Sequence, residues 1–337
     1  MKVLGIETSC DECSVAVVEN GKTIHSNVIA TQLSIHRPYN GVVPEIASRT
    51  HTEWIWPVVD RALSEADISK EGIDGVAVTN RPGLVGSLLV GLSFAKAYAY
   101  TLKKPLIAID HIRAHLYAAH LEYDIEYPYI GLIVSGGHTI ICRVDDFDTI
   151  AVLGTTIDDA CGEAFDKVAK HYGFGYPGGL AIDRLARGGD SGAFKFPDPS
   201  LHKGEHAYDV SYSGLKTAVI NQLGQFKNKP GDDRPEDIAA SFEKAAIDLL
   251  MRRVKKALSD EGISRLVAGG GVAANSYFRK LAGDLRKTDV YFPSLTLCTD
   301  NGAMVAGLGY HYLKRDITSE RTVNAFSRVE GFKKKYP

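Results

Sequence analysis

An order of strands and helices that occurs twice in the chain places the strongest constraint on its fold. Residues 2–8 form an apolar run that ends in a small polar turn, and Asn20-Gly21 is a two-residue hairpin turn between two further strand-like stretches. Strands and helices then alternate as far as residue 109. The second half begins in the same way, with an apolar run over 129–134 that ends in Ser135-Gly136-Gly137-His138. The pattern therefore predicts a duplicated α/β unit.

Each half has the same set of expected elements. In the first half we expect strands at 2–8, 14–18, 22–29, 73–79 and 106–109, and helices at 44–66, 85–101 and from 111. In the second half we expect strands at 129–134, 139–144, 149–153, 265–268 and 289–292, and helices from 158, 274 and 300. Three meandering strands followed by alternating helix and strand are typical of a ribonuclease-H-like lobe. Two such lobes around a central cleft would give the actin-like ATPase fold that actin, Hsp70 and sugar kinases share.

The repeat also predicts the domain organisation. Residues 1–110 are expected to form the N-terminal lobe and residues 111–299 the C-terminal lobe, with a helical insertion at about 174–262. A last helix and tail, 300–337, would pack across both lobes.

The composition is that of an ordinary globular protein. The 337 residues are 45% hydrophobic and 24% charged, with a net charge of −2, so a nucleic-acid partner would have to be held by local basic patches. The N-terminal apolar run is too short for a signal peptide, and Lys96 interrupts the apolar stretch that starts at Gly83. Five cysteines are an odd number and fit reduced thiols. We expect a cytoplasmic protein without a membrane partner.

His111 and His115 indicate a metal site. At i and i+4 of a helix both imidazoles lie on one face and can bind a single ion. A zinc protease of the His-Glu-x-x-His type needs a glutamate where this chain has Ile112, which argues against a metalloprotease. The repeat relates the helix that starts near His111 to the one that starts at Asp300, so Asp300 is the candidate third ligand of a 2-His-1-carboxylate set. Alternatively, Asp300 caps its helix.

Motifs along the whole chain resemble those of one family. They are Gly5-Ile6-Glu7-Thr8-Ser9-Cys10-Asp11-Glu12, Gly41-Val42-Val43-Pro44-Glu45, Val134-Ser135-Gly136-Gly137-His138-Thr139, Gly162-Glu163-Ala164-Phe165-Asp166-Lys167, Tyr176-Pro177-Gly178-Gly179, Ser213-Gly214-Leu215-Lys216-Thr217, Gly270-Gly271-Val272-Ala273-Ala274-Asn275 and Cys298-Thr299-Asp300-Asn301-Gly302-Ala303. Their order and spacing over about residues 2–312 resemble the TsaD family, the tRNA N6-adenosine threonylcarbamoyltransferases once described as sialoglycoprotein endopeptidases.

This resemblance implies an acyltransferase. The threonylcarbamoyl group of threonylcarbamoyl-adenylate would pass, in the inter-lobe cleft, to N6 of the adenosine 3′ of the anticodon, in tRNAs that read codons beginning with A. The implied cofactor is one divalent metal, Fe²⁺ or alternatively Zn²⁺, and the implied ligand is an adenine nucleotide, the adenylate or ATP. The implied partners are tRNA, the paralogue TsaB and the ATPase TsaE.

The resemblance also assigns roles to residues. The metal would be held by His111, His115 and Asp300. The nucleotide and threonyl groups would be bound by Ile133, Val134, Ser135, Gly136, Gly137, Asp166, Gly179, Asp183 and Asn275. The residue types agree, because glycine lets backbone N–H groups approach phosphate and carboxylates suit ribose hydroxyls. Asp183 could instead be an exposed helix charge.

Asp11 and Glu12 are the candidate catalytic residues. They lie at the first turn, facing the expected cleft, where a carboxylate could take the proton that leaves the exocyclic amine or orient the metal's waters. Alternatively, both are ordinary turn residues.

Two positions depart from the usual family sequence. Arg81 replaces a glycine in Arg81-Pro82-Gly83-Leu84, which limits the backbone and adds a cation. Asn40 replaces the first glycine of a Gly-Gly pair, and asparagine tolerates left-handed geometry.

The partner surfaces and the rival functions stay open at this level. Candidate tRNA contacts are Arg252, Arg253, Lys255, Lys256 and Lys333 to Lys335, and candidate TsaB contacts are Trp54 and Trp56. The rival functions are a sugar- or acetate-kinase-like phosphotransferase, which would not use the histidine pair, and an actin-like scaffold that only binds ATP. The sequence does not decide the native metal, the general base or self-association.

Overall fold

The computed structural model describes residues 1–198, 206–229 and 233–328, which form two compact units. Unit 1 consists of Met1–Ile125 together with the described residues from Pro293 onward, and unit 2 consists of Glu126–Phe292. This division differs from the boundaries predicted at 110/111 and 299/300. The difference arises because the segments that follow residues 110 and 292 pack against the first sheet or against its helices.

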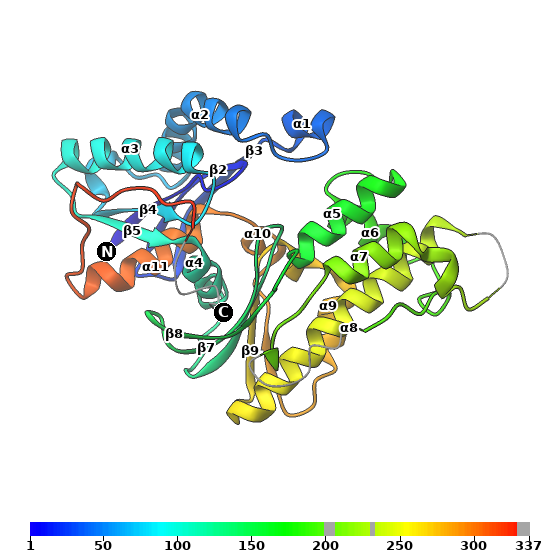
Figure 1. Ribbon diagram of the computed structural model, residues 1–337. Helices are drawn as coiled ribbons and strands as arrows, with labels where there is room; N and C mark the ends of the chain where they lie inside the picture. Colours follow the sequence, from blue (N-terminus) through cyan, green and yellow to red (C-terminus); the bar gives the residue numbers. More distant parts are fainter. Residues whose placement is uncertain (199–205, 230–232, 329–337) are drawn as a thin grey trace. The chain divides into compact units, whose positions relative to one another are not determined.

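Unit 1 is built on a five-stranded sheet with the strand order β3-β2-β1-β4-β5 (Figure 1). Its strands are β1 (Lys2–Glu7), β2 (Glu12–Glu19), β3 (Thr23–Thr31), β4 (Gly75–Arg81) and β5 (Leu106–Asp110). The first three strands are antiparallel, and β4 and β5 run parallel to β1. Asn20 takes a positive φ of 53° at the hairpin turn, as expected of asparagine in a two-residue loop.

Helices cover both faces of this sheet (Figure 1). Its helical segments are α1 (Leu33–His36), η1 (Arg37–Tyr39), α2 (Pro44–Glu65), η2 (Lys70–Gly72), α3 (Val85–Leu102), α4 (His111–Tyr117), η3 (Ala118–Leu121), α10 (Leu295–Cys298) and α11 (Gly302–Lys314). By length and apolarity alone, α3 could cross a membrane. Its buried face, which includes Leu88 and Leu92, packs into the same core as Leu4 and Val76, as the core helix of a globular unit does.

Helix α11 lies directly on β1 and β4 because small residues face each other there. A Cβ on Gly5 would overlap the carbonyl oxygen of Gly302 and the backbone nitrogen of Ala306. Close contact of this kind places α11, and with it Asp300, in unit 1. The repeat relates Asp300 to the second half of the chain, whereas Asp300 and the helix that follows it belong to unit 1.

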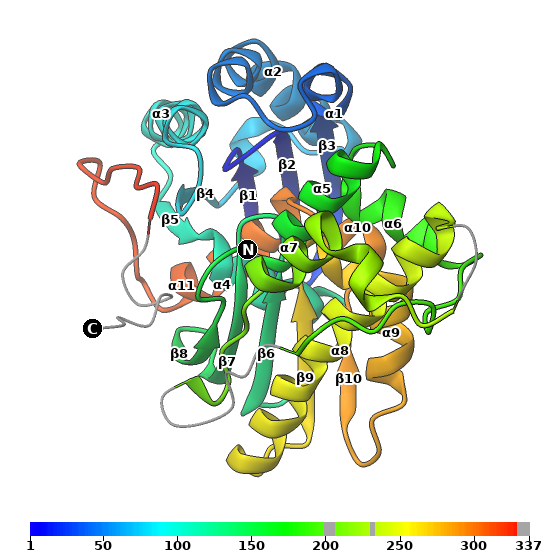
Figure 2. The same ribbon diagram turned by 45° about the vertical axis from the view of Figure 1, so that its right-hand side comes forward.

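Unit 2 repeats the architecture of unit 1 (Figure 2). Its sheet has the order β10-β9-β6-β7-β8 and contains β6 (Tyr129–Val134), β7 (Thr139–Asp146), β8 (Thr149–Thr155), β9 (Arg265–Gly269) and β10 (Asp289–Tyr291). Read from β8, the order is the same as in unit 1, with three antiparallel strands followed by two parallel ones. The predicted duplication is confirmed.

The helices of unit 2 are α5 (Cys161–Tyr172), α6 (Gly178–Ala186), α7 (Ser213–Asn221), η5 (Leu223–Phe226), α8 (Pro235–Glu261), η6 (Gly271–Ala274) and α9 (Ser276–Gly283). Helix α5 begins at Cys161 and not at 158. Asp158 instead accepts hydrogen bonds from the backbone nitrogens of Tyr212 and Ser213, at 2.8 and 3.2 Å, and so fixes the start of α7. Helix α8 has Pro235 in its first turn and ends at Gly262, whose φ is 65°.

Candidate functional site

The two histidines are fixed by the start of α4. Asp110 is the last residue of β5, and its Oδ1 accepts hydrogen bonds from the backbone nitrogens of Ile112 and Arg113, at 3.0 and 3.2 Å. Arg81 Nε lies 3.5 Å from the other carboxylate oxygen, so the cation that replaces the family glycine pairs with this cap. With the helix start fixed, the rings of His111 and His115 lie edge to face with centroids 4.5 Å apart.

Asp300, which lies in the C-terminal segment of unit 1, contacts both histidine rings. Its Oδ1 lies 3.0 Å from His115 Nε2 and 3.6 Å from His111 Nε2, and the three ligand atoms lie within 4.8 Å of one another. The cap of α11 is Asn301, whose Oδ1 accepts from the backbone nitrogen of Met304 at 3.0 Å. Asp300 is therefore not the cap, and the predicted triad is brought together within one unit.

Glu7 contacts this triad through a hydrogen bond with His111. Its side chain is fully buried, and His111 Nδ1 donates to its Oε2 at 3.1 Å. Ser9 donates its backbone N–H to Oε1 at 2.6 Å, and Thr79 donates its hydroxyl to Oε2 at 2.5 Å. Because a carboxylate only accepts, Nδ1 of His111 carries a proton, and Nε2 is the nitrogen that would bind a metal, with release of any proton it carries. A carboxylate behind a ligating histidine is the usual arrangement in metal sites.

The charges of the triad are strongly coupled. Burial lowers the pKa of His111, but the carboxylates of Asp300 and Glu7 outweigh it and raise the value to about 9. Burial and the neighbouring His111 lower the pKa of His115. Two imidazole nitrogens and one carboxylate oxygen in a nearly buried pocket are a donor set that fits a divalent transition metal such as iron or zinc.

Of the two predicted catalytic carboxylates, Asp11 lies in the turn between β1 and β2, and Glu12 is the first residue of β2. Glu12 Oε1 accepts from the hydroxyl of Thr31 at 3.3 Å. Burial, followed by the charges of Asp11 and Asp300, raises the pKa of Glu12 well above its ordinary value. A raised pKa makes a carboxylate a stronger proton acceptor than an ordinary glutamate.

The predicted nucleotide residues of unit 2 form a continuous series of contacts. Ile133 and Val134 are fully buried at the end of β6, so only their backbones could face a ligand. Ser135 and His138 close a tight turn through an N–H to carbonyl hydrogen bond of 2.8 Å. A Cβ on Gly270 would lie 2.5 Å from the carbonyl oxygen of Val134, so the second glycine-rich turn lies against the end of β6.

The series continues through α5 and α6. Gly162 at the start of α5 donates its N–H to the carbonyl of Ser135 at 3.2 Å. Asp166, one turn along, accepts from the backbone nitrogen of Gly178 at 2.7 Å, which places Gly179 beside it. Asp183 follows on α6 and accepts from the N–H and the hydroxyl of Ser276, at 2.8 and 2.6 Å.

Asn275 connects the end of this series of contacts back to the second glycine-rich turn, which directly precedes it in the sequence. It precedes Ser276, and its Oδ1 caps α9 by accepting from the backbone nitrogen of Phe278 at 2.9 Å. Its Nδ2 donates to Glu243 Oε1 at 2.6 Å. Asp183 is 5% exposed, so it is not the exposed helix charge that the sequence left open. We use the name glycine ring for the predicted nucleotide residues of unit 2 together with the glycines that connect them. These residues are Ile133, Val134, Ser135, Gly136, Gly137, Gly162, Asp166, Gly178, Gly179, Asp183, Gly270, Gly271 and Asn275.

Several glycines of this ring border open space. A Cβ built on Gly136, Gly137, Gly179 or Gly271 would meet no atom within 4 Å among the described residues. Packing therefore does not require glycine at these four positions. Glycine at such positions lets a phosphate or another polar group approach the backbone closely.

Some predicted partner residues have structural roles. Arg253 is 5% exposed, and its Nε donates to the carbonyl of Asp209 at 3.0 Å, so its prediction as an RNA contact is wrong. Arg252 pairs with Asp198 and Lys256 with Asp260, whereas Lys255 is exposed. Lys333 to Lys335 lie outside the described residues.

The tryptophans of α2 divide between core and surface. Trp54 is half-buried and packs against the hydrophobic core of unit 1. Trp56 is 54% exposed, with its ring centroid 6.2 Å from that of Phe94 on α3.

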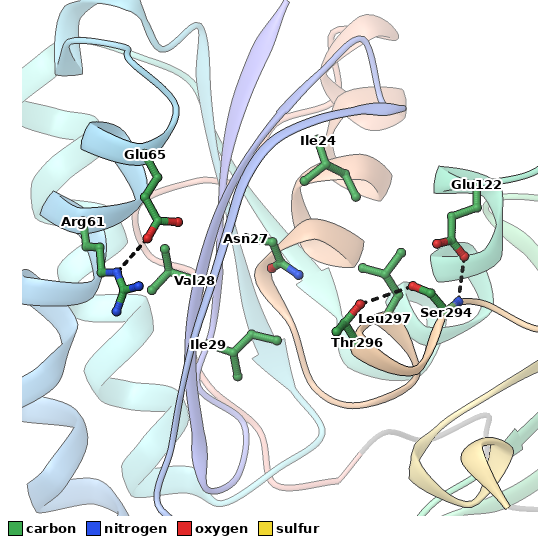
Figure 3. Close-up of a pocket in the computed structure, with 10 residues that line it drawn as sticks. All are labelled: Ile24, Asn27, Val28, Ile29, Arg61, Glu65, Glu122, Ser294, Thr296 and Leu297. Atoms are coloured by element: carbon green, nitrogen blue, oxygen red, sulfur yellow. Dashed lines mark hydrogen bonds and ion pairs between the residues drawn. The ribbon is translucent and has the colours of Figure 1, made fainter.

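Unit 1 also has a cavity of 520 Å³ that no predicted site residue lines (Figure 3). Ile24, Asn27, Val28 and Ile29 of the edge strand β3 line one side, and Thr296 and Leu297 of α10 line the other. It is therefore separate from the His-His-Asp triad.

Solved structures with a similar fold identify the fold class of this chain. HypF from T. kodakarensis aligns with a TM-score of 0.65 over 95% of this chain and 48% of its own, at 15% identity. Component A of the (R)-2-hydroxyglutaryl-CoA dehydratase of Acidaminococcus fermentans aligns with a TM-score of 0.56 over 94% of this chain and 98% of its own, also at 15% identity. With its two sheets of equal topology, the chain is a protein of the actin-like ATPase fold class, as predicted.

Sequence relatives set the family. Residues 23–307 match the TsaD family, described as tRNA N6-adenosine threonylcarbamoyltransferase. The protein of that name from Treponema denticola is 61% identical over 99% of both chains, and that from Borreliella afzelii is 54% identical over 100% of this chain and 96% of its own. The chain belongs to the tRNA N6-adenosine threonylcarbamoyltransferase family. It is a tRNA-modifying acyltransferase, which confirms the enzyme class predicted from the motifs.

The sequence did not single out two carboxylates of these sites. Glu7 lies in the first of the family motifs, at the end of a predicted strand, and a carboxylate at that position was a usable signal. Glu243 lies in the middle of a helix and no motif marks it.

Proposed function

We propose that this chain transfers the threonylcarbamoyl group of threonylcarbamoyl-adenylate to N6 of the adenosine 3′ of the anticodon, in tRNAs that read codons beginning with A. The observation that carries the proposal is the His111–His115–Asp300 cluster in a member of this family. A kinase-like or scaffolding function would make no use of such a cluster.

The cofactor in this proposal is one divalent metal, Fe²⁺ with Zn²⁺ as the alternative. His111, His115 and Asp300 would hold it, and Glu7 would keep His111 in the right tautomer. When bound, such a metal supplies Lewis-acid polarisation of a carbonyl or phosphoryl oxygen.

The glycine ring is the proposed site for the adenylate. Exposed Gly136 and Gly137 leave their backbone open to a phosphate, and Asp166 and Asp183 offer carboxylates near the same turns. Binding there would orient the carbamoyl carbon for attack.

The transfer exchanges one bond at the carbamoyl carbon for another. N6 of the tRNA adenosine forms a bond to the carbamoyl carbon, the bond from that carbon to the phosphate oxygen breaks, and AMP leaves with the bonding electrons. The amine loses one proton, which Glu12 takes up, with Asp11 as the alternative acceptor. Burial and the charges of Asp11 and Asp300 raise the pKa of Glu12, which makes its carboxylate a stronger base than that of an ordinary glutamate.

The proposed location is the cytoplasm, and the proposed partners besides tRNA are TsaB and TsaE. Exposed apolar side chains on α2 and α3, including Trp56, Val85 and Leu89, are the proposed TsaB surface. Lys255 is the proposed tRNA contact on α8.

Reconstitution tests the function. Threonine, bicarbonate, ATP, tRNA, the chain and its proposed partners should yield threonylcarbamoyladenosine by nucleoside mass spectrometry. His111→Ala should lower the amount of product by about 100-fold or more. His25→Ala changes a histidine of β3 that pairs with Glu19, and this control should form the product at the wild-type level. No product with the wild-type chain, while a known adenylate source is active in the same mixture, would refute the proposal.

A further inference from the structure

Glu243 is a nearly buried carboxylate beside the glycine ring. It lies on α8, its side chain belongs to a residue that is 6% exposed, and it adjoins Asn275 through the 2.6 Å hydrogen bond from Nδ2. Glu243 is not among the residues that we assigned to the nucleotide, to the metal or to catalysis.

Only one of its two oxygens is used. Oε1 accepts from Asn275, whereas Oε2 makes no hydrogen bond, and the carboxylate makes no ion pair, within the described part of the chain. An acid buried without a cation is costly in its charged form. Burial, and after it the negative charge of Asp183, raise the pKa of Glu243 to about 7 despite the Asn275 hydrogen bond. A group of this kind in a ligand site is a candidate for function.

The charged groups nearby make no hydrogen bond or ion pair with the free oxygen within the described residues, and each has another partner. Asp183 uses Oδ1 for the N–H and hydroxyl of Ser276, and its Oδ2 accepts from Arg187 Nη2 at 2.7 Å. Lys244, the next residue of α8, donates to Asp248 at 2.5 Å. Of the two buried carboxylates beside Asn275 and Ser276, Glu243 is thus the one with an oxygen that accepts no hydrogen bond from the described residues.

A ligand can satisfy this acceptor only with a donor. The phosphates and ring nitrogens of an adenosine nucleotide are acceptors, and its donors are the ribose hydroxyls and the exocyclic amine. A carboxylate is a stronger acceptor than an amide and forms short bonds with hydroxyls. Asp183, whose charge acts on Glu243, is one of the carboxylates that we expected at the ribose hydroxyls, and this favours the ribose over the exocyclic amine as the donor to Glu243.

We propose that the free carboxylate oxygen of Glu243 accepts a hydrogen bond from a ribose hydroxyl of the bound adenosine nucleotide. This inference rests on the proposed function, because it takes the glycine ring as the nucleotide site. It adds a substrate-binding residue from α8 to those contributed by β6, α5, α6 and the start of α9.

Nucleotide analogues test the contact. Calorimetry would compare ATP, 2′-deoxy-ATP and 3′-deoxy-ATP binding to the full chain, and the readout is the ratio of dissociation constants for each deoxy analogue and ATP. In the wild-type chain at about pH 8, above the pKa of Glu243, at least one ratio should be about tenfold or more, the usual size for a hydrogen bond to a charged group. In Glu243→Ala that ratio should fall close to one.

The ratio separates ligand contact from indirect effects. Loss of Glu243 also leaves Asn275 Nδ2 without its acceptor, but this would weaken ATP and its deoxy analogues alike. Glu243→Gln keeps an oxygen for Asn275 and replaces the free acceptor by an amide, so its ratio should fall by a smaller factor, and it serves if the alanine variant does not fold. Asp248→Asn removes a carboxylate from the same helix and should keep the wild-type ratio.

Three results would overturn the inference. The first is an unchanged ratio in both Glu243 variants. The second is a wild-type chain that binds both deoxy analogues as tightly as ATP. The third is discrimination against ITP that Glu243→Ala abolishes while the deoxy ratios stay unchanged, since this would assign Glu243 to the exocyclic amine. If the wild-type chain binds no adenosine nucleotide, the nucleotide site itself fails as well, whereas product formation in the reconstituted reaction judges the proposed transfer separately.

Discussion

Oε2 of Glu7 lies 3.1 Å from Nδ1 of His111, and both side chains are almost completely buried. Hydrogen bonds from Ser9 and Thr79 hold the carboxylate in place. Strand β1 thus fixes the orientation of a ring that belongs to α4, about a hundred residues further along the chain. The ring nitrogen that faces Asp300 is then Nε2.

Glu7→Gln should weaken metal binding about 10- to 100-fold, the usual cost of losing the carboxylate behind a ligating histidine. An amide can present its N–H₂ group to Nδ1 and so permit the wrong tautomer or ring orientation. Metal content after dialysis against a graded series of chelator concentrations measures the change. Glu65→Gln, which alters an exposed partner of Arg61, is the control. Equal retention of metal by Glu7→Gln and the wild-type chain would contradict a supporting role for Glu7.

The duplicated fold could be predicted because its evidence is local. Alternating strands and helices, the Asn20-Gly21 turn and the glycines after β6 and β9 all lie within short stretches of sequence. The three residues of the His-His-Asp cluster, which the structure brings together, could also be named, because the histidines are four positions apart on one helix and the repeat pointed to Asp300. Asn40 has a φ of 51°, as its tolerance of left-handed geometry predicted.

Contacts between distant segments were not predictable in the same way. The repeat assigned Asp300 to the second half, whereas close packing of Gly302 and Ala306 on Gly5 places α11 in unit 1. Arg253 and Lys255 belong to the same basic run, and the sequence does not show which of them faces the core. The orientation of α8 buries the side chain of Arg253 and exposes that of Lys255. The pairing of Glu243 with Asn275 joins the middle of a helix to a turn 32 positions away, with no local pattern to mark it.

Gly5→Ala should destabilise unit 1 by about 1–3 kcal/mol, because the added methyl group overlaps the backbone of α11 and forces it away from β1. Urea unfolding measures the loss. The variant should also bind metal more weakly, since Asp300 directly precedes α11. Gly283→Ala at the end of α9, where a methyl group meets no described atom within 4 Å, should change neither quantity appreciably. Equal stability of the two variants would show that the packing of α11 on β1 tolerates a side chain.

Glu243 should give the native state a distinctive pH dependence. Its pKa is about 7 in the folded chain and 4.5 by reference, with Asp183 and Arg187 as the charges that act on it. Between these values the folded chain binds more protons than the unfolded chain, so this group's contribution to stability is present below pH 4.5 and is lost as pH rises through 7. The loss is up to ~3 kcal/mol.

Glu243→Gln isolates this contribution because glutamine does not titrate. Urea unfolding of both chains between pH 4.5 and 8 should show the wild-type stability falling relative to that of the variant as pH rises. Parallel stability curves would show that Glu243 titrates normally in the folded state.

Lys255 and Arg253 should separate RNA binding from folding. Lys255→Ala should weaken tRNA binding severalfold and reduce the slope of log affinity against log salt by about 1, because one phosphate contact is lost. Arg253→Ala should lower the unfolding free energy by about 1–3 kcal/mol, because it removes the hydrogen bond to the carbonyl of Asp209 and leaves a gap in the core. Fluorescence anisotropy with labelled tRNA at several salt concentrations, together with urea unfolding, measures both effects. An unchanged salt slope for Lys255→Ala would place the tRNA elsewhere on the chain, and a stable Arg253→Ala with a reduced slope would reverse the two assignments.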